Sequence, residues 1–218
     1  MNEKVIKKFK EKGIVILDPR NTYIGTEVQI AKGNVIYPNT FLKGKIKIGP
    51  GNTLGPNLHI EGKVIIGSGN TITYSHITNS KIGNNNQIGP YARLRDNVVL
   101  KNNIKVGNFV EIKNSQVDNF TQIAHLSYIG DSRVRKRVNI GAGTITANYN
   151  SATGKKSRTI IKDRASTGSN SVLVAPVIIG ESAMIAAGSV VTKNVPKYAL
   201  AVTRPKQENK LNYTKRKT

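Results

Sequence analysis

The sequence predicts an all-β fold, a parallel β-helix in which short strands stack into a prism of triangular coils. An aliphatic residue recurs at every sixth position from Ile24 to Ile72 without a miss. A period of six fits neither an α-helix nor the face of a simple sheet, but it is a known repeat of parallel β-helices. Glycine often follows the aliphatic residue, as in Ile24-Gly25 and Ile48-Gly49, and turn-forming Asn, Asp and Ser surround it. Each hexad is therefore expected to supply one strand and one turn.

Three parts follow one another along the chain. Residues 1–13 are expected to form a short N-terminal helix that a glycine ends. Residues 14–196 are expected to form the coils, with about 18 residues, or three hexads, in each coil. Residues 197–218 form a basic C-terminal tail, which we expect to be ordered only against a partner.

The hexad frame shifts several times after Ile72. It resumes at Ile82, at Val117 and at Val134, and we expect loops to leave the coil at these shifts. Residues 144–159 have no hexad register and are expected to form an excursion loop. The last frame is expected to point six residues inward, one of them a serine: Ile160, Ser166, Val172, Ile178, Met184 and Val190.

Composition narrows the function. The 218 residues suit one domain, and they include neither cysteine nor a run of about 18 apolar residues. We therefore expect no membrane insertion and a cytoplasmic location. The formal net charge is +22, and basic residues gather in 133–164 and in the tail, so the field of the protein attracts anions. Nucleic-acid motifs are missing, which favours a small phosphorylated ligand and leaves nucleic acid as the weaker alternative.

The three histidines are His59, His76 and His125. A zinc site on a β-helix, of the kind that γ-class carbonic anhydrases have, needs three histidines in close register. The spacings here are 17 and 49 residues, so only the first pair is about one coil apart. We therefore expect no metal site, and we expect His59 and His76 to be surface or turn residues.

His125, in contrast, lies among residues that could take part in catalysis. Glu111 precedes it by 14 residues, and Asn139 follows it at the same separation. These residues can lie on adjacent coils, so that a carboxylate, an imidazole and an amide line one side. That arrangement suits general-base work by an oriented imidazole. We expect His125 to be the base and Glu111 to orient or support it.

A string of motifs resembles one family. The motifs lie in collinear order over roughly residues 13–205, and they are Ala92-Arg93-Leu94-Arg95, GNFVEIK, AHLSYIGD, VNIGAGTITANY, TGSNSVLVAPV, IAAGSVVTK and ALAVTR. The chain resembles the left-handed β-helix acetyltransferase domain of the bifunctional N-acetylglucosamine-1-phosphate uridyltransferase/glucosamine-1-phosphate N-acetyltransferase. The uridyltransferase half is expected to be absent, with only the remnant of a connecting helix before residue 13.

The resemblance implies transfer of an acetyl group from acetyl-CoA to the 2-amino group of glucosamine 1-phosphate, by a route that needs no metal. The product, N-acetylglucosamine 1-phosphate, serves the synthesis of UDP-N-acetylglucosamine and of peptidoglycan precursors for the cell wall. The resemblance also implies a homotrimer whose sites lie between prisms. The excursion loop and the tail would then reach the site of a neighbouring subunit.

The resemblance assigns site residues position by position. The proton acceptor falls on His125. The sugar-phosphate positions are Arg95, Lys113, Tyr128 and Asn139. The acetyl-CoA positions are Ala142, Asn148, Tyr149, Ser169, Ala187 and Arg204. At Ala142 it is the backbone N–H that would contact the acetyl carbonyl. The lysine of the family's loop is Lys155 or Lys156, because this loop is two residues longer.

Two segments depart from the family's pattern. A turn glycine is replaced by Arg135 within 131–137, and Ser166 stands at an expected inward position within 161–167. These changes are expected to weaken coil packing locally, yet none removes an expected catalytic side chain. Two alternatives stay open, namely an N-acyltransferase for another amino sugar and a non-catalytic trimeric paralogue.

Overall fold

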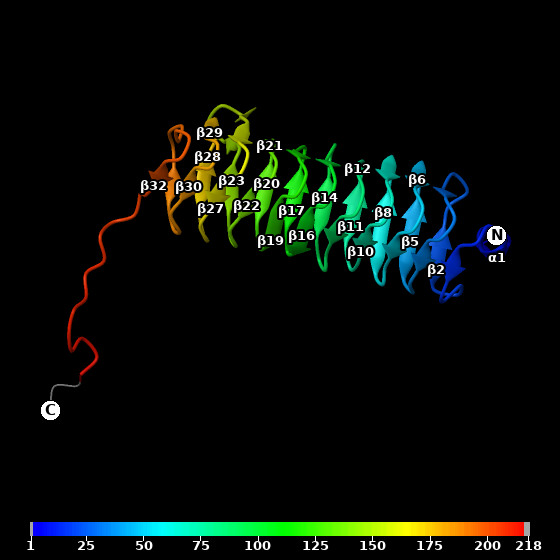
Figure 1. Cartoon of the computed structure of the whole chain (residues 1–218). Coiled ribbons are helices and arrows are strands. Elements are labelled where there is room, and N and C mark those ends of the chain that lie inside the picture. Colours follow the sequence, from blue (N-terminus) through cyan, green and yellow to red (C-terminus); the bar gives the residue numbers. More distant parts are fainter. Residues whose placement is uncertain (1, 216–218) are drawn as a thin grey trace.

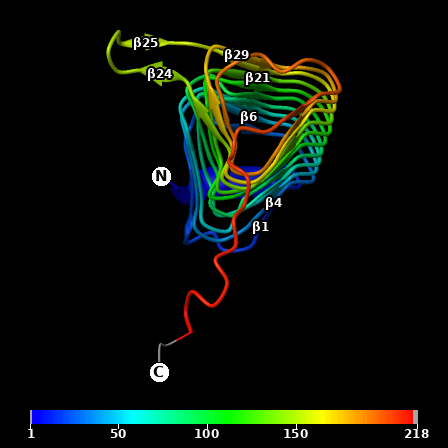
Figure 2. The same ribbon diagram turned by 90° about the vertical axis from the view of Figure 1, so that its left-hand side faces the viewer.

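The computed structural model describes residues 2–215, and of residues 2–5 the backbone only. Its strands form three parallel sheets of 11, 10 and 9 strands, which we call faces A, B and C, and a separate two-stranded hairpin. Seen along its axis, the chain winds through the three faces as a triangular prism (Figure 2). The coils stack from the N-terminal helix to the C-terminal tail (Figure 1). The fold is the left-handed parallel β-helix that the repeats and the resemblance predict.

The strands are short and follow the cycle of faces A, B and C. Face A holds β1 (Val15–Ile16), β4 (Val35–Ile36), β7 (Thr53–Leu54), β10 (Thr71–Ile72), β13 (Gln87–Ile88), β16 (Lys105–Asn108), β19 (Gln122–His125), β22 (Asn139–Ile140), β27 (Ser166–Thr167), β30 (Met184–Ile185) and β32 (Leu200–Ala201). Face B holds β2 (Thr22–Ile24), β5 (Thr40–Lys43), β8 (Leu58–Glu61), β11 (His76–Thr78), β14 (Arg93–Arg95), β17 (Glu111–Lys113), β20 (Tyr128–Gly130), β23 (Ile145–Ala147), β28 (Val172–Val174) and β31 (Val190–Val191). Face C holds β3 (Gln29–Ile30), β6 (Ile46–Ile48), β9 (Val64–Ile66), β12 (Lys81–Ile82), β15 (Val99–Leu100), β18 (Gln116–Val117), β21 (Ser132–Val134), β26 (Thr159–Ile161) and β29 (Val177–Ile179).

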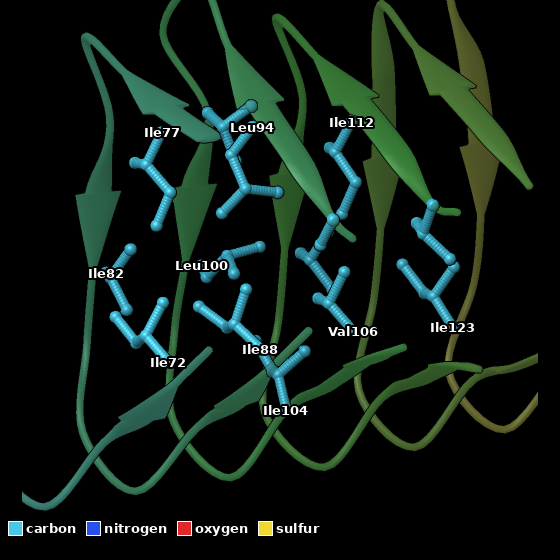
Figure 3. Close-up of a cluster of buried hydrophobic side chains, with 14 of the residues drawn as sticks. Ile72, Ile77, Ile82, Ile88, Leu94, Leu100, Ile104, Val106, Ile112 and Ile123 are labelled. Atoms are coloured by element: carbon cyan, nitrogen blue, oxygen red, sulfur yellow. The ribbon is translucent and has the colours of Figure 1, made fainter. Parts of the chain in front are cut away.

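Inward aliphatic side chains form the core and stack from coil to coil. Ile36 on β4, for example, is in register with Leu54 on β7. The residues predicted to point inward between Ile24 and Ile140 are all buried. Figure 3 shows rows of such side chains from neighbouring strands, among them Ile77, Leu94 and Ile112. Since burial of one such side chain contributes about 1.5–3 kcal/mol, these rows hold the prism together.

The frame shifts after Ile72 are shortened corners and not loops. Ile77 is buried midway between Ile72 and Ile82, so each of these steps spans five residues in place of six. The shifts before Val117 and Val134 are likewise steps of five residues. The prediction that loops leave the coil at these positions is wrong, because a corner that lacks one residue absorbs each shift.

The last hexad frame lies one residue later than the sequence analysis places it. Ile178, Met184 and Val190 are exposed, and the inward residues are Ile161, Thr167, Leu173, Ile179, Ile185 and Val191. Ser166 therefore lies on the outside of face A, where it leaves coil packing undisturbed. Most positions of this frame are pairs of aliphatic residues, so the six-residue period does not decide which member points inward. A shift of one residue reverses the faces of a strand.

The excursion from the coil is shorter than predicted. Strand β23 (Ile145–Ala147) belongs to face B, where it pairs with β20 and β28. Its inward residue is Thr146, whose hydroxyl accepts a hydrogen bond of 2.7 Å from the N–H of Gly130. Because this inward residue is polar, the pattern of aliphatic residues does not reveal that β23 keeps the register of the coil. Residues 148–158 leave the prism as the hairpin of β24 (Tyr149–Asn150) and β25 (Lys155–Lys156) (Figure 2).

Buried asparagines line the corner where face C passes to face A. Asn34, Asn52, Asn70 and Asn86 stand at equivalent positions of successive coils, and none is more than 1% exposed. From the second asparagine on, each Nδ2 donates to Oδ1 of the preceding one, at 2.9, 2.9 and 3.0 Å. Asparagines are expected in turns, and in the structure these four form an internal ladder.

Helix α1 (Asn2–Glu11) covers the first coil. Ile6 and Phe9 are buried in the same core cluster as the coil residues. Gly13 follows the helix with a φ of +76°, which a glycine adopts without steric strain, and the chain then enters β1. Within residues 2–215, no helix has the length and the apolar run that crossing a membrane requires. At the other end the tail leads away from the prism after β32 (Figure 1).

Candidate active site

His125 is the last residue of β19, at the edge where face A passes to face B, which we call the AB edge. Its side chain is exposed, and its Nδ1 lies 2.7 Å from Oδ1 of Asn108, the residue in register with it on β16. An amide oxygen only accepts hydrogen bonds, so Nδ1 donates in this contact and Nε2 keeps its lone pair. A neutral imidazole of this tautomer can accept a proton at Nε2.

Asn108, and not Glu111, is the residue that orients His125. Glu111 lies on face B, in register with Tyr128, and its Oε1 is 2.7 Å from Nη2 of Arg95. The expectation is that Glu111 orients or supports His125. The orienting contact comes from Asn108 instead, because the carboxylate of Glu111 pairs with an arginine on the neighbouring strand, and support by its charge stays a prediction. A 17-residue spacing, which is one coil on the same face, is the sequence signal that would have found Asn108.

Two cations meet one carboxylate on face B. Arg95 on β14 and Lys113 on β17 are in register, and their side chains are 26% and 21% exposed. Oδ2 of Asp96 lies 2.9 Å from Nη1 of Arg95 and 3.7 Å from Nζ of Lys113. Partial burial works to lower the pKa of Arg95, but hydrogen bonds and charges from Glu111 and Asp96 outweigh it and raise this pKa. An anion that lies between the two cations is therefore stabilised by both.

Ala142, Ser169 and Ala187 follow His125 along the AB edge, one on each of the next three coils. Backbone N–H···O hydrogen bonds of 3.4, 2.7 and 2.8 Å join these coils at the edge, and they link Gly143 to His125, Asn170 to Ala142 and Gly188 to Ser169. Successive coils lie about 4.8 Å apart. Residues far apart in the sequence thus form one continuous line that begins at the imidazole.

Asn139, Asn148 and Arg204 lie outside this group within one chain. Asn139 is exposed on face A, in register with Gln122. Arg204 is exposed in the tail. Asn148 is buried at the base of the hairpin, where its Nδ2 donates to Oδ2 of Asp131. One chain thus holds these residues on face A, at the base of the hairpin and in the tail, apart from His125.

The hairpin carries the remaining predicted residues away from the prism (Figure 2). Tyr149 is 59% exposed on β24 and pairs with Lys156 on β25. Lys155 pairs with Asn150 in the same hairpin, and both lysines are exposed. Both lysines therefore remain candidates for the lysine of the family's loop.

The two segments that depart from the family's pattern are held in the coil by local contacts. Nη1 of Arg135 lies 3.2 Å from Oδ2 of Asp118, the carboxylate of the preceding coil. The N–H of Lys136 donates to Oδ1 of Asp163 at 3.1 Å, which ties the two segments to each other. Both segments thus keep contacts within the coil, and the expected local weakening stays a prediction.

The comparisons with known proteins agree with this architecture. Residues 79–114 and 158–193 match the family model described as bacterial transferase hexapeptide (six repeats). The Francisella novicida UDP-N-acetylglucosamine acyltransferase has a similar fold, with a TM-score of 0.58 and 23% identity over 85% of this chain and 66% of that one. The Arabidopsis UDP-N-acetylglucosamine acyltransferase gives a TM-score of 0.54 and 19% identity over 86% of this chain and 69% of that one.

Closer sequence similarity links the chain to bifunctional proteins named GlmU. The protein of Pseudothermotoga lettingae is 46% identical over 209 residues, which are 96% of this chain and 46% of that protein. The protein of Carboxydothermus hydrogenoformans is 48% identical over 206 residues, which are 94% of this chain and 45% of that protein. The chain thus spans about half the length of the curated relatives that it matches. Two segments of the chain match the hexapeptide-repeat family model, and nearly its whole length is similar to one part of the bifunctional GlmU proteins.

Proposed function

We propose that the chain transfers an acetyl group from acetyl-CoA to the 2-amino group of glucosamine 1-phosphate, giving N-acetylglucosamine 1-phosphate. One observation carries the proposal. The oriented imidazole of His125 begins the line of residues along the AB edge that are expected to contact acetyl-CoA, and two cations lie on the adjoining face B. The similarity to GlmU proteins over nearly the whole chain supports the same reaction.

In the proposed mechanism, the amino nitrogen of the sugar attacks the thioester carbonyl, and Nε2 of His125 accepts a proton from this amino group. The carbonyl oxygen becomes an oxyanion as the carbonyl carbon turns tetrahedral, and the backbone N–H of Ala142, next along the AB edge, stabilises it. The intermediate then collapses and the C–S bond breaks, and the protonated Nε2 of His125 gives its proton to the sulfur, so that coenzyme A leaves as its thiol. Asn108 keeps the imidazole in the tautomer that the first step requires. Acyl transfer by this route uses no metal.

The phosphate of the sugar binds between Arg95 and Lys113 in this proposal. Oδ2 of Asp96 already stands between them, and one phosphate oxygen can take its place. Arginine offers paired N–H donors to a phosphate, which also fixes its orientation. Glu111 acts through Arg95, because its ion pair holds the guanidinium in position. Tyr128, in register with Glu111, lies beside the same ligand.

The test of this function is an assay of thiol release from acetyl-CoA with glucosamine 1-phosphate and a panel of other amino sugars. We expect the highest ratio kcat/KM with glucosamine 1-phosphate. A clear preference for another amino sugar would assign the chain to a related N-acyltransferase. Absence of transfer to any amino sugar by the folded protein would instead indicate a non-catalytic paralogue.

Replacement of Arg95 or Lys113 by alanine should chiefly raise KM for the sugar phosphate. Each substitution removes charge-assisted hydrogen bonds worth about 1.5–3 kcal/mol, or roughly 10- to 150-fold in binding. KM for acetyl-CoA should stay near the wild-type value. Arg95→Lys is the matched control, since it keeps the charge and loses the paired donors. Its KM for the sugar phosphate should lie between those of the wild type and of Arg95→Ala. If either alanine variant keeps the wild-type KM for the sugar, that residue does not hold the phosphate.

We further propose a homotrimer in which neighbouring subunits complete each site. Asn139 lies on face A while Arg95 and Lys113 lie on face B, and the hairpin and the tail project from the prism (Figures 1 and 2). Side chains on different faces of one prism meet the same ligand only if a second prism lies alongside. The same proposal places the enzyme in the cytoplasm, with small phosphorylated substrates and not nucleic acid as its ligands.

Light scattering should give a mass of about three times the 23.7 kDa of one chain. Mixed trimers provide a sharper measurement. His125→Ala and Asn139→Ala should each be impaired, and trimers reassembled from both should be more active than the mean of the two alone. Reassembly restores a site only if the two residues come from different subunits. A stable, active monomer would contradict the proposal, and so would mixed trimers without a gain.

A further inference from the structure

His59, Glu61 and His76 form a cluster on face B that the proposed acetyl transfer does not use. His59 and Glu61 lie on β8, and His76 lies on β11 of the next coil, in register with His59. Nε2 of His59 is 3.5 Å from Oε2 of Glu61, and Nε2 of His76 is 3.5 Å from Oε1 of the same carboxylate. One atom of each side chain lies within 4.8 Å of the other two. The 17-residue spacing thus brings two of the three histidines together, while His125 stays on the AB edge.

The cluster leaves a nitrogen without a partner. Nε2 of His76 is shielded from solvent and, among the residues that the structure describes, makes no hydrogen bond, although the side chain as a whole is 41% exposed. An occluded polar atom without a partner typically costs about 1–3 kcal/mol. Because this nitrogen faces the carboxylate of Glu61, a cation bound between the two would remove that cost.

We propose that His59, Glu61 and His76 bind one divalent transition-metal ion of the zinc type. Zinc takes histidine nitrogen at about 2.0–2.1 Å and carboxylate oxygen at about 2.0–2.2 Å, and in a tetrahedron such ligands lie about 3.3–3.5 Å apart. Each histidine nitrogen lies at about that separation from one oxygen of the carboxylate, His59 at 3.5 Å from Oε2 and His76 at 3.5 Å from Oε1. Two histidines and one glutamate occupy three positions and leave the fourth for water or for another ligand.

Ring contacts on face B hold the imidazoles in place, since His59 stacks on Phe41 and His76 lies tilted against His59. Tyr23, Phe41, His59 and His76 lie on four successive coils, with ring centroids 4.6, 5.9 and 4.9 Å apart. The rings of β2 and β5 thus support the ligands from one side. Because the ligand side chains are already held in place, they lose less conformational entropy when the metal binds.

Charged neighbours show what kind of ion fits. Lys43 on β5 is in register with Glu61, and Arg93 on β14 is in register with His76. These flanking cations oppose a hard ion that is held by charge alone, such as Ca²⁺ or Mg²⁺. An ion that bonds strongly to imidazole nitrogen is less affected, which favours zinc and its neighbours in the transition series. The bound ion would link β8 to β11 and so stabilise two coils against separation.

The experiment uses the full chain without a polyhistidine tag, stripped with EDTA and then titrated with Zn²⁺ in a calorimeter. We expect one ion per chain and a higher Tm in the presence of Zn²⁺, because an ion that binds only the folded state stabilises it. His59→Ala and His76→Ala should each weaken binding at least about ten-fold, as even the loss of a residue that only supports a ligand does. Both should also lose the rise in Tm, and Glu61→Gln should reduce it.

His125→Ala is the matched control, since it removes the remaining histidine of a chain that has no cysteine. It should bind Zn²⁺ as the wild type does. Comparison of each variant with and without Zn²⁺ separates metal binding from any effect of the substitution on folding. Absence of saturable binding to the wild type would overturn the proposal, as would binding that survives His76→Ala and disappears in His125→Ala.

Discussion

Replacement of His125 by alanine should lower the turnover number for acetyl transfer by about 10²–10⁴, with the fold and the assembly unchanged. The imidazole is exposed at the end of β19 and buries no core surface, so its loss leaves the prism intact. What is lost is the acceptor for the proton of the attacking amine. The wild-type rate should fall toward acidic pH, because a protonated imidazole cannot accept a proton.

Tm and turnover number measured on the same samples distinguish a catalytic from a structural histidine. If His125 is structural, its replacement lowers Tm and leaves the folded fraction active. If His125 is the base, its replacement lowers the turnover number and leaves Tm unchanged. His59→Ala is the control for loss of an exposed histidine and should keep near-normal turnover. Asn108→Ala should reduce turnover less than His125→Ala, since the base remains but loses its orienting partner. Near-normal turnover in His125→Ala would end the proposed mechanism.

The hexad pattern predicts most of the fold because it reports directly on burial. From Ile24 to Ile140 every predicted inward residue is buried, because the frame is carried by many unpaired aliphatic residues, which fix the register even at pairs such as Val35-Ile36 and Ile65-Ile66. The prediction fails in the last frame, where nearly every position is a pair such as Ile178-Ile179, because both members are apolar and no unpaired aliphatic residue fixes which one points inward. It fails also at Thr146, whose hydroxyl satisfies backbone groups in an inward position.

The resemblance proposes residues for the candidate site, and which of them lie together depends on the winding of the coils. Resemblance assigned His125 and Ala142, and the three-sided winding placed both on one edge. Separation in sequence did not reveal that Glu111 lies on a different face from His125, because three residues along a coil are enough to turn a corner. The pairing of His59 with His76 needed the coil spacing of face B, which the sequence indicated only approximately.

Replacement of Asn70 by alanine should destabilise the prism by about 2–4 kcal/mol, a large effect for one polar side chain. Asn70 is 1% exposed within the ladder at the corner between faces C and A. Its Nδ2 donates to Oδ1 of Asn52 and to the carbonyl of Gly83, both at 2.9 Å. Its Oδ1 accepts from the backbone N–H and from Nδ2 of Asn86, at 2.9 and 3.0 Å. Alanine fills less space and leaves these buried groups without their partner.

Urea denaturation measures the loss, and hydrogen exchange locates it. Each coil of a β-helix contacts only its neighbours, so protection should decrease most in the coils next to Asn70 and least near the C-terminal coils. Asn209→Ala is the matched control, because Asn209 is exposed in the tail and bonds only to the side chain of Gln207 among the described contacts. It should leave stability within about 0.5 kcal/mol of the wild type. If Asn70→Ala is as stable as this control, the ladder does not hold the corner, and the stacked aliphatic residues alone fix the geometry that places His125 on the AB edge.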